Sequence, residues 1–105
     1  MFAEIRRIES DRGIEIPTVA HAADGNLHPN FIVHSDEVPE HIWDAAGELF
    51  QSALGLGGTL TGEHGVGLLK KRWLADELGD VQWQLQKEIK GVFDPQGLLN
   101  PGKVF

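Results

Sequence analysis

The chain has 105 residues and no cysteine, which excludes disulfide bonds and thiolate metal sites and fits a reducing compartment such as the cytoplasm, where we expect the protein. Its formal net charge of −7 at pH 7 and its dispersed basic residues argue against general nucleic-acid binding. The hydrophobic fraction of 41%, with no apolar run near the roughly 20 residues that cross a bilayer, predicts a single small domain over residues 1–105 and no membrane span.

The first third of the sequence predicts a helix followed by a β-hairpin. Residues 2–12 carry apolar side chains at helical spacing, and Gly13 is placed to end the helix because glycine readily adopts the left-handed conformation. Residues 14–22 and 27–34 are rich in β-branched and apolar residues, which favour strands. The intervening Asp24-Gly25-Asn26 is typical of a tight turn, so the two strands should pair as an antiparallel hairpin.

The rest of the sequence predicts three further helical segments separated by loops. Residues 38–54 show clear helical periodicity, with an N-cap offered by Ser35-Asp36 and with Pro39 in the first turn. After this helix we expect a short extended piece at residues 59–61 that leads into a glycine-rich loop. The remaining expected elements are a helical or turn-rich segment over residues 68–78, a helix over residues 81–92 capped by Asp80, a turn at residues 94–97 and an irregular tail over residues 98–103.

Together these elements indicate an α+β fold in which helices pack on a small antiparallel sheet. The apolar side chains of the last helix share one face: Val81, Leu85, Ile89 and Val92. A two-stranded sheet is only marginally stable by itself, so further strands would come from sequence outside this chain or from a partner chain. We therefore expect a piece of a larger protein, with a complete minimal domain as the alternative.

Two sequence motifs concentrate side chains that can take part in chemistry. In the first, His21 and His28 bracket the predicted turn. In one extended strand their odd separation would place them on opposite faces, so the turn must fold the chain back if both are to meet one ligand. In the second, Glu63 and His64 are adjacent within a glycine-rich stretch. Neutral imidazoles and a carboxylate form a ligand set that suits a divalent first-row metal such as zinc.

Simpler interpretations stay open for these residues. The hairpin histidines could merely satisfy backbone hydrogen bonds, and Glu63-His64 could be a solvated pair in a loop. The basic run Lys70-Lys71-Arg72 is interpreted as a solvated helix face rather than as a phosphate site.

Three segments occur in a fixed order along the chain: His21-Ala-Ala-Asp-Gly-Asn-Leu-His28, Gly57-Gly-Thr-Leu-Thr-Gly-Glu-His-Gly-Val-Gly67 followed by Lys70-Lys71, and Asp94-Pro-Gln-Gly-Leu-Leu-Asn-Pro-Gly-Lys103. In this order and at this spacing they resemble the C-terminal end of the FAD-linked oxidases of the vanillyl-alcohol oxidase type. The branch is that of the glycolate oxidase flavoprotein subunit, D-lactate dehydrogenase and D-2-hydroxyglutarate dehydrogenase. The resemblance covers nearly the whole chain, from about residue 21 to residue 103.

The resemblance implies a partial ferredoxin-like domain that carries a metal site and a catalytic base. It implies that His21, His28 and Glu63 bind a divalent metal, usually zinc. It also implies that His64 is the base that takes a proton from the 2-hydroxyl group of the substrate while hydride passes to the flavin. A metal that holds the carboxylate and the hydroxyl of a 2-hydroxy acid would lower the pKa of that hydroxyl.

The resemblance further implies that Asn30 contacts the substrate, and that Asn100 and Lys103 lie near the flavin or the domain junction. The sequence departs from the family pattern at Ala23, where the first motif usually has glycine. A methyl group at this position either fits the tight turn or strains it.

On this resemblance the chain is the C-terminal, substrate-side portion of an FAD-dependent dehydrogenase or oxidase that converts a D-2-hydroxy acid to a 2-oxo acid. The FAD-binding domain, which lies upstream in the family, is absent from the chain, so we expect the chain to be inactive alone. Its partners would be the 2-hydroxy-acid substrate and an FAD-binding domain or subunit, with homo-oligomerisation left open. The alternatives are a stand-alone divalent-metal-binding module and a degenerate interaction domain.

Overall fold

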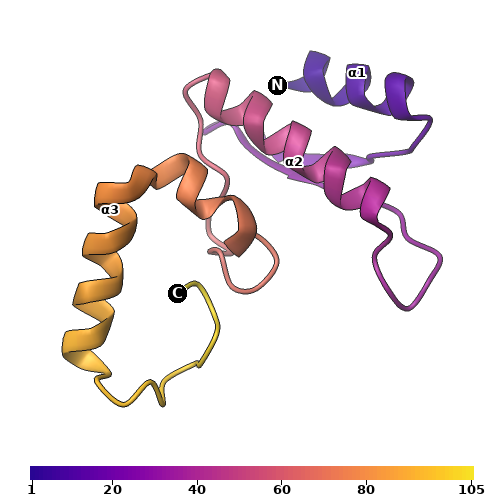
Figure 1. Ribbon diagram of the computed structural model, residues 1–105. Helices are drawn as coiled ribbons and strands as arrows, with labels where there is room; N and C mark the ends of the chain where they lie inside the picture. Colours follow the sequence, from indigo (N-terminus) through magenta and orange to yellow (C-terminus); the bar gives the residue numbers. More distant parts are fainter. The chain divides into compact units, whose positions relative to one another are not determined.

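A computed structural model describes all residues of the chain, 1–105, as two compact units, Met1–Gly58 and Thr59–Phe105. The second unit contains one long helix, α3 (Lys71–Phe93), flanked by irregular segments. The first unit contains α1 (Phe2–Arg12), β1 (Thr18–His21), β2 (Asn26–Pro29) and α2 (Glu40–Gly55) (Figure 1). Helices combined with an antiparallel sheet confirm the predicted α+β class.

Helix α1 ends where the sequence predicts. Gly13 adopts the left-handed conformation, with φ 63° and ψ 37°, and its N–H donates to the carbonyl of Glu9. A side chain at this position would strain the backbone, because residues other than glycine and asparagine rarely adopt this conformation.

The two strands pair as the predicted antiparallel hairpin, but each has only four residues. Prolines at the outer ends explain the difference. Pro17 directly precedes β1 and Pro29 ends β2, and neither can donate a backbone hydrogen bond to an extended ladder. The expected strands over residues 14–22 and 27–34 were therefore too long.

The core of the first unit lies between α1, α2 and the segment that leads into the hairpin. The buried apolar cluster consists of Ile5, Ile8, Ile16, Ala45 and Leu49. Partly buried hydrophobic residues pack against this cluster: Met1, Ile14, Leu27, Phe31 and Phe50. The two helices are also joined at the surface, where Glu48 accepts hydrogen bonds from Arg7 and Arg12, each at 2.8 Å. Both hydrogen bonds lower the pKa of Glu48, and the bond from Arg12 has the larger effect.

Helix α2 begins later than the sequence predicts. Its N-cap is Pro39, in an extended conformation, and its first residue is Glu40. Ser35 does not cap the helix, because its hydroxyl donates to the carbonyl of Glu37 at 2.5 Å. The expected cap at Ser35-Asp36 was therefore wrong: the serine hydroxyl closes a local turn before the helix.

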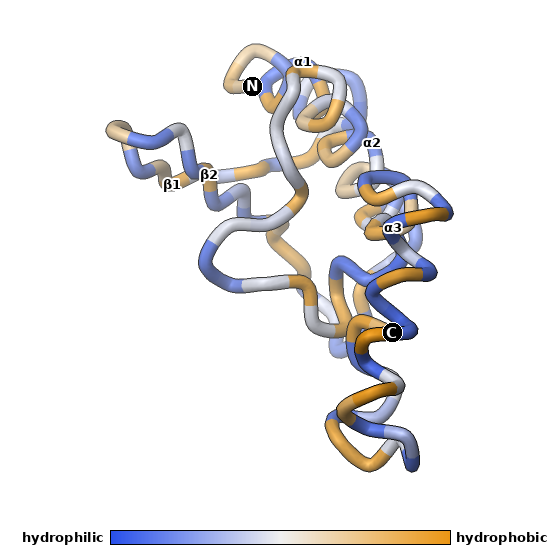
Figure 2. Tube along the Cα trace, turned by 90° about the vertical axis from the view of Figure 1, so that its left-hand side faces the viewer, coloured by the Kyte–Doolittle hydropathy of each residue, from blue (hydrophilic) through white to orange (hydrophobic).

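Helix α3 is interrupted at Gly79, whose φ of 67° and ψ of 168° are not helical. The break confirms two consecutive helical segments, although the first starts at Lys71 rather than near residue 68, and the interrupting residue is Gly79. Hydrophobic and hydrophilic residues alternate along this helix (Figure 2). The apolar face of its second half is open to solvent, with exposed fractions of 47% to 80% for Val81, Leu85, Ile89 and Val92. None of the helices has both the length and the apolar character required to cross a membrane.

Candidate metal and catalytic site

The hairpin places His21 and His28 on the same face. In the register, Val19 lies opposite His28 and Ala20 lies opposite Leu27. Residues directly opposite each other share a face, and so do residues two apart in one strand, so His21, Val19 and His28 project together. Because Leu27 packs against the core, the histidines occupy the outer face of the hairpin. The two imidazole rings meet edge to face, with their centroids 5.1 Å apart.

The turn that brings the histidines together is stabilised by its own side chain. The carboxylate of Asp24 accepts the N–H of Asn26 at 3.1 Å, which is a typical Asx turn. Gly25 takes a φ of 74° and donates to the carbonyl of His21 at 3.2 Å. Ala23 is not among the residues with positive φ, so its methyl group fits the turn without backbone strain.

Asn30 closes the open end of the hairpin. Its side-chain amide donates to the carbonyls of Pro17 and His28, at 3.1 and 2.9 Å, and its backbone N–H also donates to Pro17. The structure therefore shows a structural role for the donors of this side chain, which the sequence did not predict. Its carbonyl oxygen is the atom that remains for a ligand.

Glu63 and His64 lie in an exposed, glycine-rich loop of the second unit. The Nε2 atom of His64 lies 3.8 Å from a carboxylate oxygen of Glu63, which is an ion-pair distance rather than a hydrogen bond. The loop is closed internally, because the hydroxyl of Thr61 donates to the carbonyl of Gly65 at 2.7 Å and the N–H of Gly65 donates to Gly62. No regular strand forms at residues 59–61, where a short extended piece is expected.

The three basic residues after this loop do not form one solvated face. Lys70 is partly buried and its ammonium group lies 3.4 Å from the hydroxyl oxygen of Thr61. Burial lowers the pKa of Lys70, while the nearby charge of Glu63 opposes this shift. Lys71 donates to the carbonyl of Gly102, and Arg72 lies over the ring of Trp73 at 5.5 Å. Lys70 is thus a charged group beside the loop, and its burial could not be read from a run of three basic residues.

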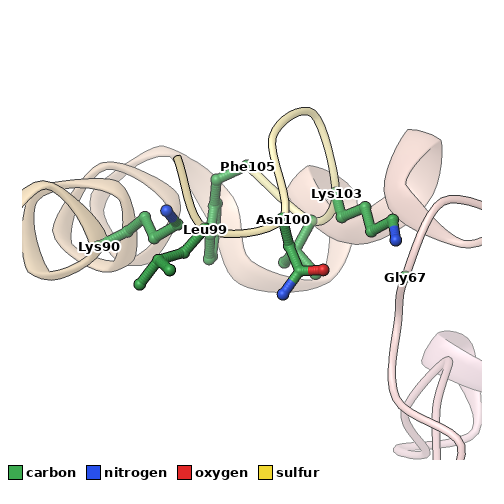
Figure 3. A pocket seen from close by; sticks show the side chains of 7 residues that line it. Gly67, Lys90, Leu99, Asn100, Lys103 and Phe105 are labelled. Atoms are coloured by element: carbon green, nitrogen blue, oxygen red, sulfur yellow. The ribbon is translucent and has the colours of Figure 1, made fainter. Parts of the chain in front are cut away.

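Asn100 and Lys103, which are the expected cofactor-binding residues, line one open cavity of about 450 Å³ in the second unit (Figure 3). The other lining residues are Gly67, Lys90, Leu99, Val104 and Phe105. The backbone here is unusual, since Asn100 and Val104 are the two residues other than glycine with positive φ, at 48° and 63°.

Asp94 organises this cavity, although the sequence indicated only a turn at its position. It is 8% exposed, and its carboxylate accepts the N–H groups of Leu98 and Leu99 and a charged hydrogen bond from Lys90. The hydrogen bond from Lys90 is the main reason why the pKa of Asp94 is lowered. An aspartate followed by Pro-x-Gly at the end of a helix is the sequence signal for this arrangement, because the turn brings the next amides back to the carboxylate.

The family model described as "FAD linked oxidases, C-terminal domain" matches residues 1–104, so the chain belongs to this family.

The relatives that the chain resembles are named as a glycolate oxidase subunit and as D-lactate dehydrogenases. The chain is 44% identical over 108 residues to the glycolate oxidase subunit GlcD of Bacillus subtilis, which covers 100% of the chain and 23% of the relative. It is 39% identical over 97 residues to a D-lactate dehydrogenase of Archaeoglobus fulgidus, covering 92% of the chain and 21% of the relative. It is also 39% identical over 87 residues to the mitochondrial D-lactate dehydrogenase [cytochrome] 1 of Saccharomyces cerevisiae, covering 83% of the chain and 15% of the relative. The chain thus spans less than a quarter of the length of these relatives.

Proposed function

We propose that this chain is the substrate-side portion of an FAD-dependent enzyme that oxidises a D-2-hydroxy acid to a 2-oxo acid. The family membership and the names of the relatives support this reaction class. We propose that the FAD-binding domain belongs to the part of the enzyme outside this chain, and that the chain alone does not turn over. FAD, when bound, supplies the hydride acceptor that no amino-acid side chain can provide.

The observation that carries the proposal is the pairing of His21 and His28 on one face of the hairpin. Zinc holds imidazole nitrogens at about 2.0–2.1 Å, so two nitrogens on one ion lie no more than about 4 Å apart. The ring nitrogens of His21 and His28 that could serve as ligands lie within 4.8 Å of each other, which is close to this limit. The residues therefore fit a divalent metal, which would supply Lewis-acid polarisation of the substrate oxygens.

The remaining ligand and the base are proposed from the second motif. We propose Glu63 as the third protein ligand, on the strength of its sequence motif and of the preference of zinc for mixed imidazole and carboxylate ligands. His64 would accept the proton of the substrate hydroxyl, because imidazole is the side chain that titrates nearest neutral pH. The free carbonyl oxygen of Asn30 would contact the substrate, and Asn100 and Lys103 would contact the flavin or the domain that binds it.

Zinc binding to the full chain tests the histidine pair. Isothermal titration with zinc at pH 7 should give one site, and His21→Ala and His28→Ala should each lower the affinity by at least about tenfold, because each removes one metal–nitrogen bond. His41→Ala is the matched control, since His41 is an exposed histidine on α2, outside the hairpin, and its loss should leave the affinity unchanged.

The outcome for each ligand can be separated. Equal zinc affinity in the wild type, His21→Ala and His28→Ala would contradict the metal proposal as a whole. Glu63→Gln tests the third ligand by itself: unchanged affinity in this variant would remove Glu63 from the site and leave the histidine pair in place.

A further inference from the structure

The loop that carries Glu63 and His64 has little packing of its own. The side chains of Glu63 and His64 are half or more exposed, and Gly65 and Gly67 adopt positive φ, at 72° and 56°. Such a loop keeps one conformation only if its two ends are fixed, because glycine loses more conformational entropy on ordering than other residues. Both ends are held by groups on α3 and on the segment that follows it.

Glu77 holds the start of the loop. One carboxylate oxygen accepts the hydroxyl of Thr59 at 2.5 Å and the other accepts the N–H of Leu60 at 3.0 Å. Leu60 is 3% exposed, so the backbone that enters the loop is tied to a buried side chain and to a charged acceptor. Hydrogen bonds to an ionised group are stronger than neutral ones.

Residues 98–105 hold the end of the loop. The N–H of Val104 donates to the carbonyl of Gly67 at 3.2 Å, and the ring of Phe105 packs on that of Trp83 with centroids 5.1 Å apart. Figure 3 shows Gly67 beside the cavity that this segment lines. Val104 takes a φ of 63°, which is rare for a β-branched residue. Strained backbone of this kind persists only where the surroundings fix it, and it is concentrated at functional segments.

We propose that Glu77 is a positioning residue: with residues 98–105, it fixes the conformation of the loop that presents Glu63 and His64. This inference rests on the proposed function for the chemical roles of Glu63 and His64, but the anchoring itself can be measured without metal or substrate. Between these two anchored ends, the loop is closed by the bond from the hydroxyl of Thr61 to the carbonyl of Gly65 and by the bond from the N–H of Gly65 to Gly62.

Amide hydrogen exchange of the full chain, followed by NMR, tests this inference. Glu77→Ala should raise the exchange rates of the Leu60 and Gly65 amides by at least about tenfold, because both bonds at the loop entrance are lost. Glu77→Gln keeps an oxygen acceptor and should stay within about threefold of the wild type. Glu88→Ala removes the same charge from a different turn of α3 and should leave both amides unchanged.

A second variant tests the other end. Val104→Pro removes the N–H that reaches Gly67 and cannot adopt the positive φ of this position, so it should release this end of the loop and speed exchange at Gly65. Val104→Gly keeps the N–H and suits the positive φ, so it should not. A wild-type exchange rate at Gly65 in both Glu77→Ala and Val104→Pro would overturn the inference. Faster loop exchange in Glu77→Ala together with unchanged zinc affinity in Glu63→Gln would support the anchoring and contradict Glu63 as a ligand, so the two proposals fail separately.

Discussion

Asp94 shows how much structure one side chain can impose on an irregular segment. Its carboxylate accepts hydrogen bonds from two backbone N–H groups, at 2.8 and 2.9 Å, and from the ammonium group of Lys90. The chain leaves α3 at this residue, and the turn to Gly97 is closed by the N–H of Gly97 on the carbonyl of Asp94. The direction of the segment that lines the cavity is therefore set by a single acceptor.

The pH dependence of stability should reveal this role in an Asp94→Asn variant. The hydrogen bond from Lys90 and the two amides hold the pKa of Asp94 below its ordinary 3.8. A carboxyl with a lowered folded-state pKa stabilises the fold above its unfolded-state pKa and loses that contribution as the pH falls through the folded-state value. In circular-dichroism melts, Asp94→Asn should unfold at lower temperature than the wild type at pH 6, and the gap should close from about pH 4 downwards.

Glu48 also has a lowered pKa, but it is present in both proteins, so the difference between their melting temperatures reports Asp94. A gap that stays constant down to about pH 2 would show that the charge of Asp94 does not contribute.

At this scale the sequence predicted the candidate residues better than their partners. The pairing of His21 and His28 followed from residue types and the turn between them, and the hairpin confirms it. The contacts of Glu77 with Thr59 and Leu60 span 18 and 17 positions, and no local pattern indicates such pairs. Asn30 was predicted as a substrate contact, yet its donors are bound to nearby backbone carbonyls.

Among the elements, the end of α1 was predicted from its terminal glycine, whereas the ends of the two strands and the start of α2 were not. Gly13 ends α1 because the left-handed conformation is nearly free for glycine. The strands were overestimated because apolar β-branched residues continue past the two prolines that end the ladder. The apolar face of the second half of α3 was identified, but periodicity alone does not say whether such a face is covered.

Helix α1 offers a direct test of where the packing energy of the first unit lies. Ile8 is fully buried in the core cluster, so Ile8→Ala should lower the free energy of unfolding by about 2–5 kcal/mol, through lost burial and the cavity left behind. Phe2, on the same helix, is 54% exposed, and Phe2→Ala should cost less than about 1 kcal/mol. Urea denaturation followed by circular dichroism measures both values. Equal losses in the two variants would contradict the assigned core.

For the whole molecule, apolar burial is distributed unevenly between the two units. The buried hydrophobic residues of Met1–Gly58 are Ile5, Ile8, Ile16, Ile42, Ala45, Ala46 and Leu49. Those of Thr59–Phe105 are Leu60, Trp73 and Leu74. The second unit therefore depends more on hydrogen bonds around Glu77 and Asp94, which contribute less net stability than burial of large apolar side chains.

We therefore expect the second unit to open at lower free energy than the first. In native-state hydrogen exchange with increasing urea, the amides of α3 should lose protection before those of α1 and α2, because the free energy of local opening follows the local density of buried apolar contacts. Within α3 the part after Gly79 should lose protection first, since its apolar face is exposed. Ile8→Ala is the internal control: it should lower protection in α1 and α2 and leave the order of loss within α3 unchanged. Loss of protection in all three helices at one urea concentration would show a single cooperative unit and contradict this expectation.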